Sequence, residues 1–229
     1  MKYTFMALAG LALASSCPAI AMDRAPSPAT KRVEAPAAAD APVLGAAAAR
    51  VASWVTASSD NRALPYMIID KPAATAFLFD GTGKPLAQLP VLLGIAIGDH
   101  SSPGVGKKKL AEIGPAEKTT PSGRFLAKFG LAVGRQQVLW VDYANSVALH
   151  PIPPGANPKE RRRQRMLSPT SEDNRITFGC INVPSAFYAK SVKPLFRKKG
   201  GYVYVLPDQL PLEQVFPLVG VRQAPPVQG

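Results

Sequence analysis

The chain has 229 residues, and its 27 Lys and Arg outnumber its 15 Asp and Glu, which gives a formal net charge of +12. This length accommodates one domain with appendages. Because 47% of the residues are apolar and 7% are aromatic, the chain can build a globular core and is neither wholly disordered nor collagen-like. Its two cysteines are too few for a disulfide-rich scaffold.

The first 21 residues have the pattern of a secretion signal. Lys2 supplies a short basic region, residues 5–16 are apolar, and residues 19–21 read Ala-Ile-Ala, a pattern after which a signal peptidase cuts. This apolar stretch and the next one, residues 86–97, are both shorter than the roughly 20 residues that span a bilayer. We therefore expect an exported chain, in the periplasm or the cell wall, with a signal peptide at residues 1–21 and no membrane span.

Cleavage after residue 21 would leave a net charge of +11 and a single cysteine, Cys180. An unpaired cysteine in an oxidising compartment is a liability unless it is buried, paired between chains or needed for chemistry. Lipidation at Cys17 is an alternative to this cleavage. It fits less well because the aliphatic Leu13 lies four positions before the cysteine, where a lipoprotein signal has three.

Residues 22–62 precede the predicted domain. Residues 22–42 are rich in Ala and Pro with almost nothing large and apolar to bury, which indicates an extended tether. In residues 43–58, apolar side chains recur at three- and four-residue steps, which predicts a short amphipathic helix that packs against the domain. We place the domain at residues 63–207.

The first half of the domain has strand patterns. They predict strands at residues 66–70, 75–79, 86–97, 123–131 and 137–149. The Asp-Gly-Thr-Gly of residues 80–83 can close a hairpin. Residues 100–121 predict a long surface loop that leads into a tight turn at Thr-Pro-Ser-Gly.

The second half begins with residues 151–175, whose early prolines and basic run predict an insertion with a helical middle. A strand at residues 176–183 would direct Phe178, Cys180 and Asn182 to one face. The remaining patterns predict a helix from Pro184 that bends or ends near Pro194, a strand at residues 202–206, and a proline-containing surface tail at residues 208–229.

Cys180 is the first candidate for chemistry. It follows Gly179 at the end of a predicted strand, and a glycine there lets consecutive backbone amides point at one spot, as an oxyanion site beside a nucleophile requires. The alternative is a small buried hydrophobic residue, which a free cysteine usually is. The chemical role is favoured because Cys180 would be the only cysteine of the exported chain.

A thiol attacks as a thiolate, and a neighbouring histidine is the usual means of removing its proton. The chain has two histidines. His150 ends an apolar strand and precedes Pro151, so its side chain can face a cleft, whereas His100 lies in a polar loop and is expected in solvent. We therefore expect His150 to be the base.

Three motifs together resemble the catalytic domain of the L,D-transpeptidases, also called the YkuD domain. They are Thr-Pro-Ser-Gly-Arg-Phe at residues 120–125, His150, and Arg-Ile-Thr-Phe-Gly-Cys-Ile-Asn at residues 175–182. The family pattern is a His-Gly, a spacer, and then Ser/Thr-x-Gly-Cys followed by an aliphatic residue and Arg or Asn. The resemblance covers residues 66–207 and implies a mainly β fold, with sandwich-like mixed sheets and one or two short helices.

The resemblance also implies an acyl-transfer cycle on peptidoglycan stem peptides, with no metal and no organic cofactor. Cys180 would attack the carbonyl that joins the third residue, a diamino acid, to the terminal D-alanine, and His150 would move the protons. The amides of Phe178, Gly179 and Cys180 would hold the oxyanion. An amine of a second stem would then form a 3→3 cross-link, whereas water would make the enzyme an L,D-carboxypeptidase.

Two features depart from the family pattern. Pro151 replaces the glycine after His150, although its carbonyl can still orient the imidazole. His150 and Cys180 are 30 positions apart, which is longer than the usual spacing, and the extra length carries three arginines at residues 161–163. This insertion is expected to cover or extend the cleft.

Arg175 and Asn182 are the candidate substrate-binding residues. Arg175 lies five residues before the nucleophile, and a guanidinium pairs with a carboxylate through two hydrogen bonds. A structural ion pair, for example with Asp173, is an equal alternative. Asn182 shares the predicted face of Cys180 and either fixes the nucleophile loop or contacts substrate, whereas Thr177 on the opposite face is expected to be structural.

The basic charge has several explanations. Nucleic acid is the default partner of so basic a chain, but export and the lack of a nucleic-acid-binding motif argue against it. Anionic envelope polymers fit better, and the lysine clusters equally fit a solvated surface. The main hypothesis is an exported cysteine transpeptidase. The alternatives are an L,D-carboxypeptidase or amidase on the same scaffold, and a wall-binding module that has lost turnover.

Overall fold

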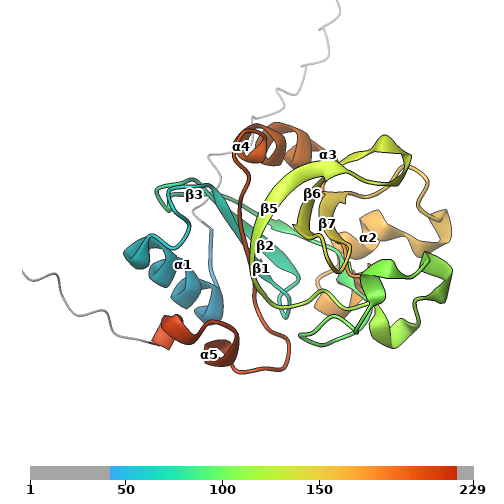
Figure 1. Cartoon of the computed structure of the whole chain (residues 1–229), viewed down its shortest axis with the longest axis horizontal. Helices are drawn as coiled ribbons and strands as arrows, with labels where there is room; N and C mark the ends of the chain where they lie inside the picture. The colour runs from blue at the N-terminus through green and yellow to red at the C-terminus, as the bar shows by residue number, and fades with distance from the viewer. Residues whose placement is uncertain (1–41, 221–229) are drawn as a thin grey trace, which may run out of the picture. The chain divides into compact units, whose positions relative to one another are not determined.

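The structure is a computed structural model that describes residues 42–220 (Figure 1). The predicted signal peptide, most of the predicted tether and residues 221–229 lie outside the described residues. Within residues 42–220, no helix is both long enough and apolar enough to cross a membrane.

The fold is mainly β, as the sequence predicts. Eight strands form one mixed sheet in the order β3-β2-β1-β10-β5-β6-β7-β9, with β1 parallel to β10 and β7 parallel to β9. These strands are β1 (Tyr66–Asp70), β2 (Thr75–Phe79), β3 (Pro85–Pro90), β5 (Gly123–Leu131), β6 (Gln137–Asp142), β7 (Val147–Pro151), β9 (Ile181–Val183) and β10 (Gly201–Val205). Two short strands, β4 (Leu93–Gly94) and β8 (Arg175–Thr177), form a separate parallel pair.

The helices are short apart from the first. They are α1 (Ala46–Ser58), α2 (Arg162–Met166), α3 (Ser185–Phe187), α4 (Lys193–Phe196) and α5 (Leu212–Val215). A π-helical turn, Tyr188–Val192, joins α3 to α4. Pro194 lacks an amide proton and its ring crowds the preceding turn, so a wider turn before it keeps the segment helical. The helix predicted from Pro184 is therefore present, with its irregularity just before Pro194.

Strand β1 is buried along its whole length because both faces of its sheet are covered. Its side chains alternate between two core clusters, with Met67 and Ile69 in one and Tyr66 and Ile68 in the other. The first cluster also contains side chains of β6, β7, β9 and the helical segment 185–196, so the sheet curls over one of its own faces. The second is closed by α1 and α5, which lie together in Figure 1.

Three predicted strands have the same bounds in the structure, namely β1, β2 and β5. The prediction of one strand over residues 137–149 is wrong, because β6 and β7 form a hairpin there. Its turn is stabilised by hydrogen bonds from the backbone and side chain of Asn145 to the Asp142 carboxylate, and Ser146 adopts a positive φ of 58°. Residues 86–97 likewise split, because the chain leaves β2 after Pro90 and pairs with β8 as β4.

Residues 208–220 do not form the surface tail that their prolines predict. Leu212 and Phe216 are only 8% and 3% exposed and belong to the core cluster beneath α1. Pro211 and Pro217 stand at the starts of helical turns, where the fixed φ of proline is favourable. The compact region therefore continues to residue 220, beyond the predicted boundary at residue 207.

Candidate active site

The nucleophile segment is not the continuous strand predicted over residues 176–183. It breaks at residues 178–180, so that β8 pairs with β4 while β9 pairs with β7. Gly179 makes the break possible, since its φ is +119°, and a Cβ there would lie 2.7 Å from the carbonyl oxygen of Thr119. Cys180 is thus presented from a sharp bend between two sheets.

Two threonine side chains hold this bend. The Thr177 hydroxyl donates to the Cys180 carbonyl at 2.6 Å and accepts a hydrogen bond from the Gly179 amide at 3.2 Å. The Thr120 hydroxyl donates to the Gly179 carbonyl at 2.9 Å and accepts from the Gly94 amide at 2.9 Å. The Thr-Pro-Ser-Gly motif therefore contributes to the site by fixing the backbone of the nucleophile loop.

These hydrogen bonds bear on the expected oxyanion donors. The Gly179 amide is directed to the Thr177 hydroxyl, so it is not free to bind an oxyanion in this conformation. Phe178 lies at the rim of the site with 37% of its surface exposed, and the Lys118 ammonium lies 3.9 Å from the centre of its ring. An oxyanion role for the amides of Phe178 and Cys180 stays a prediction.

The Cys180 thiol is partly buried beside the β6–β7 turn. Its sulfur lies 3.7 Å from the Ser146 carbonyl oxygen. Burial raises the pKa of the Cys180 thiol above its ordinary value, while a hydrogen bond with the Ala148 backbone and the positive charge of Arg162 oppose that rise. The thiol is therefore protonated at neutral pH and needs a base to become a nucleophile.

His150, near the end of β7, is placed to be that base. Its Nδ1 lies 2.7 Å from the Pro151 carbonyl oxygen, so Nδ1 carries the proton and Nε2 is the basic nitrogen. Burial lowers the pKa of His150, the hydrogen bond to Pro151 opposes this, and the charge of Arg162 lowers it further. The expected orientation of the imidazole by the Pro151 carbonyl is therefore present.

Cys180 immediately precedes β9, which pairs with β7, the strand that carries His150. His150 pairs in register with Asn182, two residues beyond Cys180, so the side chains of His150 and Asn182 lie on one face of the sheet. Among the described residues, no hydrogen bond joins the thiol to the imidazole. The Asn182 side-chain nitrogen lies 3.5 Å from both ring nitrogens of His150, which places the amide against the ring.

Arg162 is the residue of this site that the sequence analysis did not single out. It is the first residue of α2 in the insertion, and its guanidinium donates to the Asn182 side-chain oxygen at 2.9 Å. It also pairs with Glu160 at 2.6 Å, and its side chain is only 12% exposed. The run of three arginines was the available signal. The backbone at the start of α2, where Arg161 has a positive φ of 50°, determines that Arg162 is the arginine that faces the site.

Arg175 lies in a buried network of charges. Its guanidinium binds the Asp208 carboxylate through two hydrogen bonds of 2.5 and 3.1 Å and donates to the Lys71 carbonyl at 3.3 Å. The Lys71 ammonium in turn lies 3.0 Å from Asp99 and 3.3 Å from Asp208. These contacts favour the ion-pair alternative, with Asp208 in place of Asp173 as partner, and leave substrate binding by Arg175 a prediction without support from its geometry.

Two further observations concern His100 and possible metal ligands. His100 is exposed in its loop, as expected. Over residues 42–220, no group of three or more His, Cys, Asp and Glu side chains is arranged to hold a metal ion.

Comparison with known proteins gives a likeness of fold. No family model and no curated protein matches the chain. Among solved structures, an L,D-transpeptidase from Stackebrandtia nassauensis has 15% identity and a TM-score of 0.37, covering 72% of this chain and 68% of its own. An L,D-transpeptidase from Mycobacterium smegmatis has 16% identity and a TM-score of 0.34, covering 62% and 58%. The helical cell shape determining protein Pgp2 from Campylobacter jejuni has 12% identity and a TM-score of 0.41, covering 69% and 55%.

The chain thus spans little more than half the length of two of these structures. With identities of 12–16% and TM-scores of 0.34–0.41, the likeness concerns the path of the chain.

Proposed function

We propose that this chain is an exported cysteine acyltransferase that acts on peptidoglycan stem peptides, releases the terminal D-alanine and forms 3→3 cross-links. The observation that carries the proposal is the state of the Cys180 and His150 pair. A protonated thiol on the Gly179 loop contacts the backbone just before β7, and β7 carries a neutral imidazole whose Nδ1 is fixed on the Pro151 carbonyl. The motif resemblance supplies the substrate class.

The reaction begins with transfer of the thiol proton of Cys180 to Nε2 of His150 as the sulfur attacks the scissile carbonyl carbon. A carbon–sulfur bond forms and the carbonyl oxygen takes the electron pair. When the tetrahedral intermediate collapses, the carbon–nitrogen bond breaks and the imidazolium returns its proton to the departing amine of D-alanine. An amine of a second stem then attacks the thioester and regenerates the thiol.

The neutral state of both groups suits this sequence. A fixed thiolate–imidazolium pair would need a lowered thiol pKa and a raised imidazole pKa, and the shifts here run the opposite way. Proton transfer therefore accompanies attack. Asn182 acts as a positioning residue, because its amide contacts the ring while Arg162 holds its oxygen.

The test is intact mass measurement after incubation with a carbapenem and, separately, with purified tetrapeptide-stem muropeptides. We expect a covalent adduct and release of D-alanine with the unaltered protein, and neither with Cys180→Ala. His150→Ala should reduce turnover by about 100-fold or more. His100→Ala is the matched control, and because His100 lies in an exposed loop, this variant should keep its turnover.

The products distinguish the activities. Dimers joined 3→3 establish the transpeptidase, and tripeptides alone establish the carboxypeptidase on the same scaffold. If the folded protein forms no adduct and leaves the stems unchanged, the catalytic proposal fails and a wall-binding module is the better account.

A further inference from the structure

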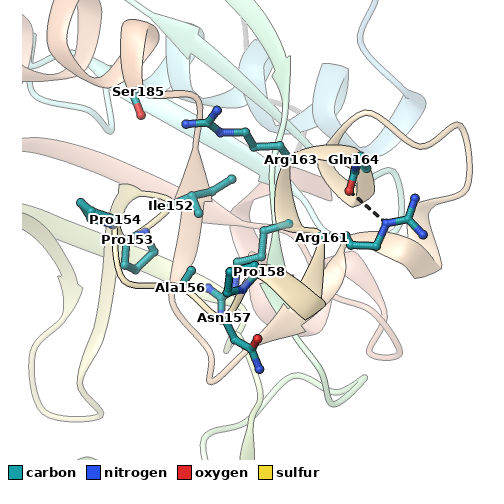
Figure 2. Close-up of a pocket in the computed structure, with 11 residues that line it drawn as sticks. Ile152, Pro153, Pro154, Ala156, Asn157, Pro158, Arg161, Arg163, Gln164 and Ser185 are labelled. Carbon is teal, nitrogen blue, oxygen red and sulfur yellow. Dashed lines mark hydrogen bonds between the residues drawn. The ribbon is translucent and has the colours of Figure 1, made fainter.

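A pocket of about 470 Å³ lies between the segment that follows β7 and the start of α2 (Figure 2). Its wall contains Arg161, Arg162 and Arg163, and it contains no aspartate or glutamate. The opposite wall is formed by apolar residues, including Ile152, Pro153 and Pro154. Such a pocket suits a ligand that combines an anionic group with a short apolar side chain.

The positive charge of this pocket is largely uncompensated. Arg163 has no ion pair or side-chain hydrogen bond with any residue between 42 and 220. Among the same residues, the Arg161 guanidinium donates only to the neutral Gln164 side chain, at 3.1 Å. Arg162 alone has an acidic partner, Glu160. Guanidinium groups bind carboxylates and phosphates through paired hydrogen bonds, and a carboxylate is the anion that a peptide offers at its C-terminus.

The pocket adjoins the Cys180 site through two connections. Arg162 reaches from its wall to the side-chain oxygen of Asn182, and the Asn182 nitrogen contacts the His150 ring. Ile152 lines the pocket only two residues after His150. The arginine wall is therefore linked to the imidazole through one side chain, that of Asn182.

We propose that this arginine pocket binds the C-terminal carboxylate of the donor peptide, on the residue that leaves. This inference rests on the proposed function. His150 must give its proton to the departing amine, so the leaving residue lies on the His150 side of the scissile bond. Its carboxylate is one residue from that bond, and the Arg162 guanidinium is separated from the His150 ring by the side chain of Asn182 alone.

The experiment measures equilibrium binding in the Cys180→Ala background, so that no turnover is needed. The ligands are a tetrapeptide stem with a free C-terminal carboxylate and the same peptide with a C-terminal amide, titrated by calorimetry. We expect the acid to bind about tenfold more tightly than the amide, which corresponds to about 1.4 kcal/mol. The double variant Arg161→Gln/Arg163→Gln should bring this ratio to about threefold or less, because it leaves only Arg162 in the pocket.

A matched control removes the same charge elsewhere. Arg197 and Lys198 are exposed and follow α4, about 18 Å along the helical segment from Ser185 at about 1.5 Å per residue. The variant Arg197→Gln/Lys198→Gln should keep the tenfold ratio. An equal loss in both double variants, an unchanged ratio in the pocket variant, or no difference between acid and amide would overturn the proposal.

The experiments distinguish a wrong assignment of the pocket from a wrong proposed function. If the unaltered protein releases D-alanine but the pocket variant keeps the acid preference, the pocket assignment is wrong and the activity stands. If the acid preference depends on Arg161 and Arg163 but no D-alanine is released, the carboxylate pocket stands and the acyltransferase proposal is wrong.

Discussion

Burial acts on both members of the Cys180 and His150 pair, and it keeps both of them neutral. It raises the pKa of the thiol and lowers that of the imidazole, because in each case the charged form loses solvation. Arg162 stabilises a thiolate but disfavours an imidazolium, so its charge lowers both pKa values. One residue of the insertion therefore tunes the nucleophile and the base together.

Thiol alkylation by iodoacetamide should report this state, measured in a chain that starts at residue 22, where Cys180 is the only cysteine. Because the thiol pKa is raised above 9.0, the rate should be low at pH 7 and should keep rising above pH 9. Arg162→Gln should slow alkylation further at each pH, since it removes a charge that favours the thiolate. A rate that levels off below pH 7 would instead indicate a thiolate–imidazolium pair and would contradict this assignment.

Local sequence signals predicted the strands well where an apolar or alternating run ends at clear turn residues. β1, β2 and β5 have their predicted bounds because each is an apolar or alternating run that ends at clear turn residues. The predictions failed where the chain changes partners. The bend at Gly179 and the hairpin turn at Asn145 interrupt runs that look continuous, because pairing with β4, β6 and β9 outweighs local propensity there.

The C-terminal segment makes a testable contribution at the scale of one element. Phe216 is 3% exposed in the cluster beneath α1, whereas Leu218 two residues later is 58% exposed. Phe216→Ala should lower the free energy of unfolding by about 3–5 kcal/mol, the usual cost of removing a buried aromatic side chain. Leu218→Ala should change it by less than about 0.5 kcal/mol. Urea unfolding of both variants checks this, and equal small effects would mean that the segment is a surface tail after all.

At the scale of the whole molecule, a charge network joins segments that are far apart in the sequence. Lys71 is fully buried after β1 and donates to the carbonyls of Gly98 and Thr120 as well as to Asp99. The Asp99 carboxylate accepts hydrogen bonds from the amides of residues 208, 209 and 210. Since Arg175 binds Asp208, the network also anchors β8, the strand that leads to Cys180.

This network should make stability depend on pH below about 4. Burial alone would raise the pKa of Asp99, but hydrogen bonds from the backbone of residues 208–210 and from Lys71 outweigh it and hold that pKa well below its ordinary value. The contribution of Asp99 is therefore present above the ordinary aspartate pKa and is lost as the pH falls, because only the unfolded chain takes up the proton there.

Asp99→Asn should lower the free energy of unfolding at pH 7 by about 3 kcal/mol. This is near the lower end of the usual cost of removing one partner of a buried ion pair, because Lys71 still has its ion pair with Asp208. The variant should also lose less stability than the unaltered protein between pH 7 and pH 3. Urea unfolding across this range measures both effects, with the exposed Asp173→Asn as control. Equal slopes for the two proteins would show that Asp99 does not carry the acid sensitivity.

The sequence by itself determined the mainly β class and most strand positions. It also indicated Cys180, His150, Gly179 and Asn182 as candidate site residues, because such candidates are recognised from local pattern and spacing. Tertiary structure alone decided which groups meet. The partner of Arg175, the burial of Lys71 and the approach of Arg162 to Asn182 all join segments distant in the chain. The physical reason is that a buried charge needs an opposite charge or hydrogen-bonding partners, and the fold, not the adjacent sequence, brings those partners to it.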